Sequence, residues 1–212
     1  MPMRTAKQSP TALPWQRRPD NSLRHHAGSH LLNPEAVAQF DRYLHRINPQ
    51  APQIDADRIA TLARWLQDLP EAQAWNVLND RLSRFELLRA MRNDPDWSAG
   101  DDTHRRIDAL LAYFDHGDSE QLIPSGIPLL GLLDDVLLLE LAWPALQIEA
   151  EDYRDFCGFR AADERPQGSG IKLREAWVRA RLEALALHRH HARVNASHYA
   201  DSGSPSQPFR IS

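Results

Sequence analysis

Cysteine is almost absent from this sequence: among 212 residues the single one is Cys157. One cysteine can form neither an intrachain disulfide nor a cysteine-based zinc site. We therefore expect the fold to depend on packing rather than on covalent cross-links or a structural zinc ion. The shortage of cysteine is typical of proteins in a reducing compartment, so a cytoplasmic location is predicted.

Motifs of the common enzyme classes are missing as well. None of the nine glycines belongs to a glycine-rich phosphate loop, and the chain has no serine nucleophile elbow and no His/Glu zinc-protease motif. No group of side chains indicates one particular reaction. We therefore predict no catalytic residue and no cofactor, and we interpret the chain as a binding protein before an enzyme.

The charge is modest overall but uneven along the chain. A formal net charge of −4 and a pI near 6.2 give no general reason to expect nucleic-acid binding. Residues 1–30, however, hold five Lys/Arg against one Asp and contain no apolar stretch of signal-peptide length. We predict a flexible basic arm over residues 1–30, in which Arg17 and Arg18 are candidates for contact with an acidic partner.

Apolar residues recur at three- and four-residue spacing along most of the chain, as they do on one face of an α-helix. No stretch alternates apolar and polar residues as a half-buried strand does. The sequence predicts an all-α fold, a compact bundle of about six to seven helices in a single domain over residues 31–200, with a disordered tail over residues 201–212. The helices are expected to begin near residues 34, 55, 70, 101, 131, 149 and 171.

The most apolar of these helices contains "VLLLELAW", residues 136–143, which is apolar on every side except at Glu140. Such a helix is surrounded either by other helices or by lipid. A membrane span needs about 20 mostly apolar residues, and the acids of this region interrupt the run too often. We predict that it is the central helix of the bundle. The alternative is a peripheral membrane protein that uses this Leu-rich helix or the basic last helix.

Two adjacent acids, Asp134 and Asp135, fall in the first turn of the Leu-rich helix. Unpaired amide groups and the helix dipole favour negative charge there, typically by about 0.3–1 kcal/mol per carboxylate. This structural role is enough to explain both acids. The alternative is a metal-dependent enzyme in which Asp134, Asp135 and Glu140 hold a divalent cation, although adjacent helical residues point about 100° apart.

The stretch "LIPSGIPLLGLLDDVLLL" carries two Ile-Pro pairs, a Leu-Gly pair and the two acids at fixed spacing. It resembles the signature of the YkvA-like proteins, a family built on a domain of unknown function, over residues 110–150. The resemblance implies a helical hairpin that turns at the prolines, with no established chemistry and, in some relatives, an association with membranes. The matching positions are Pro124, Pro128, Gly131, Asp134 and Asp135. Gln121 and Ser125 depart from the pattern, because the family usually has Asp at both positions.

The prolines and glycines of this stretch also have a direct physical interpretation. Each proline disfavours helix for the residue before it, so Ile123 and Ile127 are expected to be extended. Ile127 is a candidate for insertion into the core, while Gly126 and Gly131 are expected to permit close backbone approaches.

The last predicted helix, over about residues 171–196, is basic. Its candidate partner-binding residues are Arg174, Arg179 and Arg181, which suit an acidic protein or an anionic membrane surface. The opposite, apolar side is predicted to pack inward through Leu173, Trp177, Leu182 and Leu185. A weaker alternative is a metal site formed by His188, His191 and His198, which share one helical face.

The leading hypothesis from the sequence is a cytoplasmic, non-enzymatic helical module that acts through contact with a protein partner. Its expected docking surfaces are the basic arm and the basic last helix. No nucleic acid is expected as a partner. Membrane association and metal-dependent catalysis remain the competing hypotheses.

Overall fold

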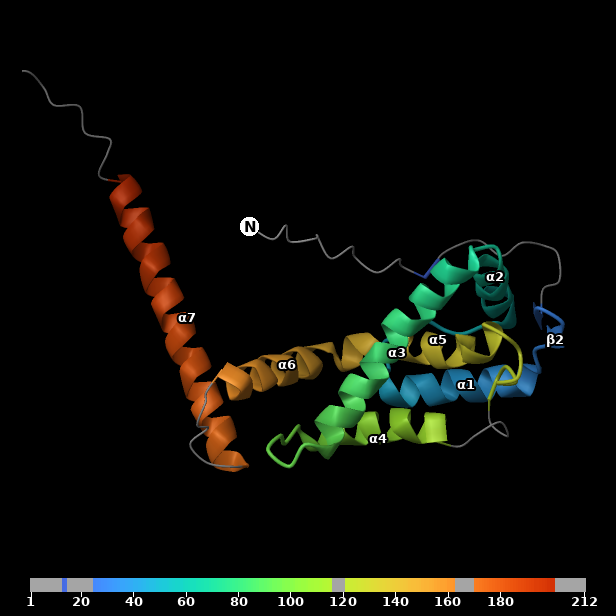
Figure 1. The fold of residues 1–212 in the computed structure, drawn as a ribbon, viewed down its shortest axis with the longest axis horizontal. Helices are drawn as coiled ribbons and strands as arrows, with labels where there is room; N and C mark the ends of the chain where they lie inside the picture. The colour runs from blue at the N-terminus through green and yellow to red at the C-terminus, as the bar shows by residue number, and fades with distance from the viewer. Residues whose placement is uncertain (1–12, 15–24, 116–120, 163–169, 201–212) are drawn as a thin grey trace, which may run out of the picture. The chain divides into compact units, whose positions relative to one another are not determined.

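A computed structural model describes residues 13–14, 25–115, 121–162 and 170–200 (Figure 1). Within these residues it contains seven α-helices and one two-stranded hairpin, so the predicted all-α fold is confirmed. The helices are α1 Pro34–Ile47, α2 Ala56–Gln67, α3 Glu71–Asn93, α4 Asp101–Asp115, α5 Leu133–Ala142, α6 Gln147–Ala162 and α7 Ile171–Ala200. Short 3-10 turns, η2 Leu130–Leu132 and η3 Trp143–Ala145, flank α5.

The chain divides into two compact units, whereas a single domain over residues 31–200 was predicted. Unit 1 holds Met1–Asp94 and Ser98–Arg154, and unit 2 holds Pro95–Trp97 and Asp155–Ser212. Helix α6 belongs in part to each unit. Each unit is therefore described by itself below.

The first two helices begin where local sequence predicts. The side chain of Asn33 accepts a hydrogen bond from the backbone N–H of Glu35 at 2.9 Å, and Pro34 occupies the first helical position. The side chain of Asp55 accepts from the N–H of Arg58 at 2.8 Å. In both helices a short polar side chain satisfies an amide that the helix itself leaves without a partner.

Helix α5 lies at the centre of unit 1, where it contacts α1, α3 and α4. Figure 1 shows α3 running obliquely across α4 and α5. Six apolar side chains of α5 are at most 1% exposed: Leu133, Val136, Leu137, Leu138, Leu139 and Ala142. The predicted central position of the Leu-rich helix is thus confirmed. Each buried leucine or valine contributes about 1.5–3 kcal/mol of hydrophobic stabilisation.

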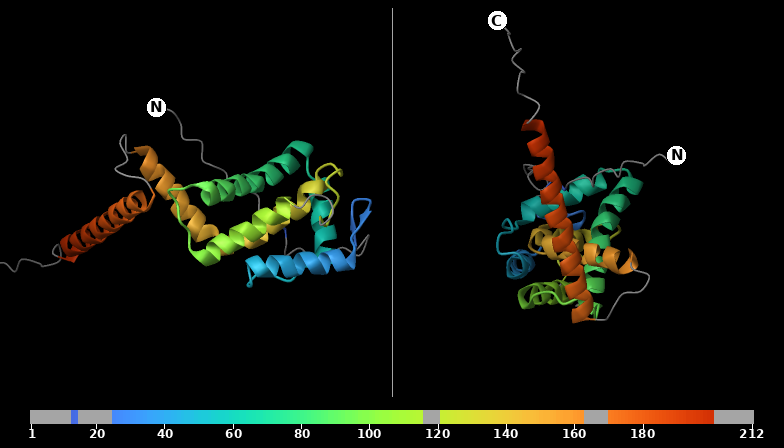
Figure 2. Two further views of the ribbon diagram at one scale, coloured as in Figure 1. Left: turned by 90° about the horizontal axis from the view of Figure 1, so that it is seen from below. Right: turned by 90° about the vertical axis from the view of Figure 1, so that its left-hand side faces the viewer.

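A small hairpin occupies part of the segment that was predicted to be a flexible arm. Strands β1 His26–Ala27 and β2 His30–Leu31 pair antiparallel beside α2 (Figure 2). Gly28 adopts φ +62° in the turn, and Ala27 is fully buried. The prediction was wrong for residues 25–30, because two-residue strands are too short to leave an alternating pattern. The earlier part of the arm, apart from residues 13–14, lies outside the described residues.

The turn that delivers α5 into the bundle depends on Gly131. Its N–H donates to the carbonyl of Ile127 at 2.7 Å, and a Cβ placed on Gly131 would lie 2.5 Å from the backbone oxygen of Ser125. The predicted close approach is confirmed there, but a Cβ on Gly126 would meet nothing within 4 Å. Ile127 is only half-buried; Ile123 is the fully buried isoleucine of this turn.

Unit 2 is organised around three aromatic rings from separate parts of the chain. Trp97 lies between α3 and α4, Phe156 on α6 and Trp177 on α7, with ring centroids 5.2–5.9 Å apart. The indole N–H of Trp177 donates to Asp155 at 3.1 Å, and the N–H of Gly170 donates to Asp96 at 2.5 Å. These contacts fix the N-terminal part of α7 on its unit.

Replacing Gly131 by alanine is expected to destabilise unit 1 by about 1–3 kcal/mol, because the backbone of Ser125 must move to admit the new methyl group. Urea unfolding of the full chain measures this difference. The matched control is Gly126→Ala in the same turn, which should change the free energy of unfolding by less than about 0.5 kcal/mol. Equal losses in the two variants would contradict this account of the turn.

Candidate functional site

Asp134 is the most enclosed acid of the motif, with none of its surface exposed. Its Oδ2 accepts hydrogen bonds from the Tyr113 hydroxyl at 3.1 Å, the Leu122 N–H at 2.9 Å and the Ile123 N–H at 3.4 Å. Asp134 therefore links the start of α5 to α4 and to the loop before the turn. The sequence places Asp134 in the first helical turn but does not reveal Tyr113, which is distant in the chain.

Burial outweighs the helix dipole in setting the protonation of both acids. Desolvation raises the pKa of Asp134, and the three hydrogen bonds oppose this only in part. Asp135 is 6% exposed, and burial followed by the charge of Asp134 raises its pKa to about 7. Within the described residues, the Oδ1 atoms of both acids are buried without a hydrogen-bond partner. The pair is therefore expected to hold a proton near neutral pH.

Burial also raises the pKa of the Tyr113 hydroxyl, with the charge of Asp134 as the next cause. Tyr113 accordingly stays protonated and donates to Asp134. None of the three groups is open to solvent, because Tyr113 is 6% exposed and both aspartates are as buried or more so. This arrangement suits a structural link within unit 1 better than contact with a substrate.

The arrangement gives little support to the metal alternatives. Within the part of the chain that the structure describes, no three His, Cys, Asp or Glu side chains are grouped so that they could hold a metal ion. Glu140 instead pairs with two arginines of α3, with its Oε2 3.3 Å from Arg81 and 2.9 Å from Arg84. His188 and His191 are exposed on α7, and the side chain of His198 lies outside the described residues.

The large apolar side chains of α7 from Val178 to Leu187 are exposed. Leu173 and Trp177 pack inward as predicted, but Leu182 is 61% exposed and Leu185 49% exposed, so the prediction that these two leucines pack inward was wrong. The helix continues beyond Phe156 and Trp97, which cover only its N-terminal part. Val178 is 41% exposed on the same face as these two leucines, and Leu187 is 57% exposed about half a turn away.

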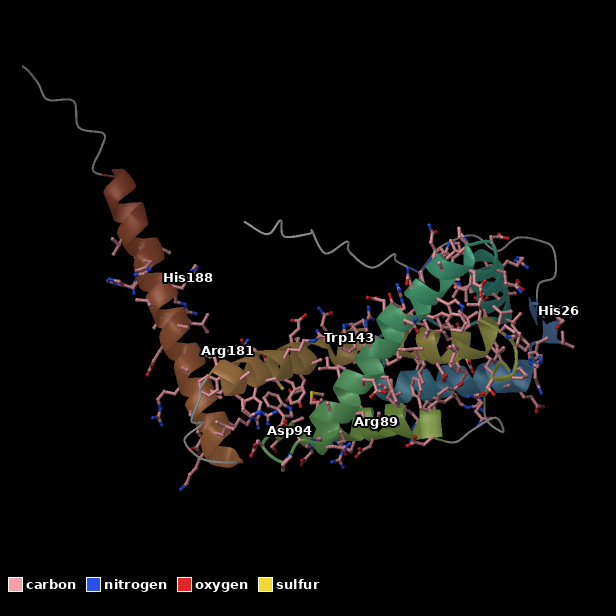
Figure 3. All side chains as sticks on the ribbon, in the orientation of Figure 1. His26, Arg89, Asp94, Trp143, Arg181 and His188 are labelled. Atoms are coloured by element: carbon pink, nitrogen blue, oxygen red, sulfur yellow. The ribbon has the colours of Figure 1, made fainter. Side chains whose placement is uncertain are left out.

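The predicted partner-binding arginines of α7 lie around this surface. The guanidinium groups of Arg174 and Arg181 stack on Trp97 and Trp177, 5.0 and 5.4 Å from the ring centroids. Arg179 is exposed. Figure 3 labels Arg181 and His188, and around His188 the side chains project outward from α7. Arg17 and Arg18, the other predicted contacts, lie outside the described residues.

The two helices that were predicted as alternatives for membrane contact are the Leu-rich α5 and the basic α7. No helix among the described residues combines the length and the hydrophobicity that crossing a bilayer requires. The leucines of α5, one of the two predicted membrane-contacting surfaces, are buried inside unit 1. The two surfaces predicted to bind a partner are the basic arm and α7. Of these, α7 is the one that exposes most of its length within the described residues.

Comparisons of the chain with protein-family models, with curated proteins and with solved structures found no match. The resemblance to the YkvA-like proteins therefore stays a prediction that depends on the spacing of Pro124, Pro128, Gly131 and the two aspartates.

The raised pKa of Asp135 predicts how stability depends on pH. The folded state binds a proton that the unfolded chain releases near pH 4, so this contribution to the free energy of unfolding is complete below about pH 4 and is lost as the pH rises towards 7. Asp135→Asn removes the titrating group. Urea unfolding is measured between pH 4.5 and 8.5. Below pH 7, the free energy of unfolding of the wild type should fall with pH more steeply than that of Asp135→Asn, by about 1.4 kcal/mol per pH unit.

Glu86→Gln serves as the control, because Glu86 is an exposed carboxylate on α3 in the same unit. Its unfolding free energy should follow the wild-type pH dependence. If the unfolding free energies of the wild type and of Asp135→Asn changed with pH in parallel, the conclusion that the aspartate pair holds a proton would be contradicted.

Proposed function

We propose that this protein is a non-enzymatic interaction module that binds another protein through the exposed face of α7. The observation that carries the proposal is a set of three large apolar side chains, 41–61% exposed, that share one face of α7: Val178, Leu182 and Leu185. Apolar side chains gathered in this way on a surface are typical of interaction sites.

The chemistry of unit 1 supports a scaffold role for that unit. The buried acids of the motif are used to attach a loop and α4 to the central helix, and Glu140 is used in ion pairs with α3. Under this proposal unit 1 supplies a stable body, while α7 supplies the binding surface. A cytoplasmic location is part of the proposal, as is membership of the YkvA-like type.

Substituting both exposed leucines, Leu182→Ser and Leu185→Ser, is expected to abolish recovery of the protein partner. Full-length chains are immobilised, incubated with lysate of the native cell, and the retained proteins are quantified by mass spectrometry. Surface substitutions change stability by about 0.5 kcal/mol or less, so thermal unfolding should be nearly unchanged and loss of binding would not reflect loss of the fold.

The matched control is Ile148→Ser, because Ile148 is 76% exposed and lies on α6 instead of α7. This variant should retain the same proteins as the wild type. Equal retention by the double-leucine variant and the wild type would contradict binding through α7. Loss of retention in the Ile148 variant alone would place the binding surface in unit 1.

A further inference from the structure

Three of the exposed apolar residues of α7 form a narrow ridge with a charged end. Val178, Leu182 and Leu185 are spaced by four and three residues, so they share one helical face. Arg189 follows at the next four-residue step and continues the same line. A ridge with this spacing is the form in which one amphipathic helix meets a groove or a second helix.

Positive charge surrounds the ridge. From residue 172 to 194, α7 carries six Lys/Arg against two Glu. Arg174 and Arg181 are seven residues apart, so they form a row beside the ridge, and their stacking on Trp97 and Trp177 restricts the guanidinium groups before any partner binds. Cations held in place in this way lose less side-chain entropy on binding, which favours a partner that presents carboxylates.

The same features argue against two other occupants of the ridge. A second copy of this chain would bring the same excess of positive charge against itself, and like charges placed across an interface are unfavourable. A membrane surface favours a helix with one broad apolar face. Here Leu187 is exposed about half a turn away from the ridge, and Arg189 ends the ridge with a charge.

We infer that α7 binds an acidic amphipathic helix of another protein, whose apolar residues contact Val178, Leu182 and Leu185 and whose carboxylates meet Arg181 and Arg189. This inference rests on the proposed function and adds the chemical nature of the partner. The leucines supply the buried contact, and the arginines select for negative charge and orient the incoming helix.

The test uses a fluorescein-labelled helical peptide with leucines at i, i+4 and i+7 and glutamates on both sides of them. A second peptide carries lysines in place of the glutamates. Fluorescence anisotropy with the full chain should show saturable binding of the acidic peptide, with an affinity at least about tenfold above that of the lysine peptide, and binding should weaken as salt is raised. Equal affinity for the two peptides, or no binding of the acidic one, overturns the inference.

Arg189→Glu tests the charge without disturbing the aromatic stacking of Arg181. We expect it to weaken binding of the acidic peptide by about fivefold or more, since a favourable contact becomes a repulsive one. Leu182→Ser should weaken binding as well. Arg42→Glu, an exposed arginine of α1 in unit 1, is the matched charge control and should leave the affinity unchanged. Loss of affinity in the control equal to that of Arg189→Glu overturns the inference.

Two further measurements separate the competing occupants. Flotation with phosphatidylserine–phosphatidylcholine vesicles that depends on Leu182 would overturn the inference in favour of a membrane. A concentration-dependent dimer in sedimentation, abolished by Leu182→Ser, would overturn it in favour of a second copy.

Binding through α7 and the acidic nature of the partner can be disproved separately. If cellular partners depend on Leu182 and Leu185 but are retained equally by Arg189→Glu and at high salt, the docking function stands and the acidic partner is wrong. If the double-leucine variant retains all partners, both fail.

Discussion

Unit 1 depends on the removal of α5 from water on nearly all of its sides. Eight of the ten residues of α5 are buried and only Glu140 and Leu141 are partly exposed, so α1, α3 and α4 must each present an apolar face to it. The geometry of the turn before α5 follows from the same requirement. The helix can enter an enclosed position only if the chain approaches closely, which is why a side chain at Gly131 would collide with the backbone of Ser125.

Such nearly complete burial has a cost at the polar residues that enter the core with the leucines. Asp134 receives three hydrogen bonds, whereas Asp135 receives little compensation and instead takes up a proton more readily. Arg81, 1% exposed, donates to the carbonyl of Val77 at 3.1 Å and lies 3.3 Å from Glu140. Removing one partner of a fully buried ion pair costs about 3–5 kcal/mol. The cost is smaller here because the side chain of Glu140 is 26% exposed, but these polar contacts still restrict the ways in which α3 and α5 can pack.

Local signals were predictable from the sequence, and contacts between distant segments were not. Asn33 and Asp55 act on neighbouring amides, so their capping roles follow from a few residues of sequence. The hydrogen bond from Tyr113 to Asp134 joins two helices, and no local sequence signal near either residue predicts it. Helical spacing shows that Leu182 and Leu185 share a face, but not whether anything lies against it. Gly126 and Gly131 look equivalent in sequence, and only the position of Ser125 distinguishes them.

The aromatic cluster of unit 2 has a consequence for biosynthesis. Trp97 leaves the ribosome with α3, whereas Trp177, the ring it packs against, is made only after α4, α5 and α6. During translation the nascent chain therefore carries Trp97 without the Trp177 ring until the start of α7 has been made. A contact between such distant residues also forms more slowly than a local one. The Trp97 indole accordingly reaches its final packing only after both Phe156 and Trp177 have been made.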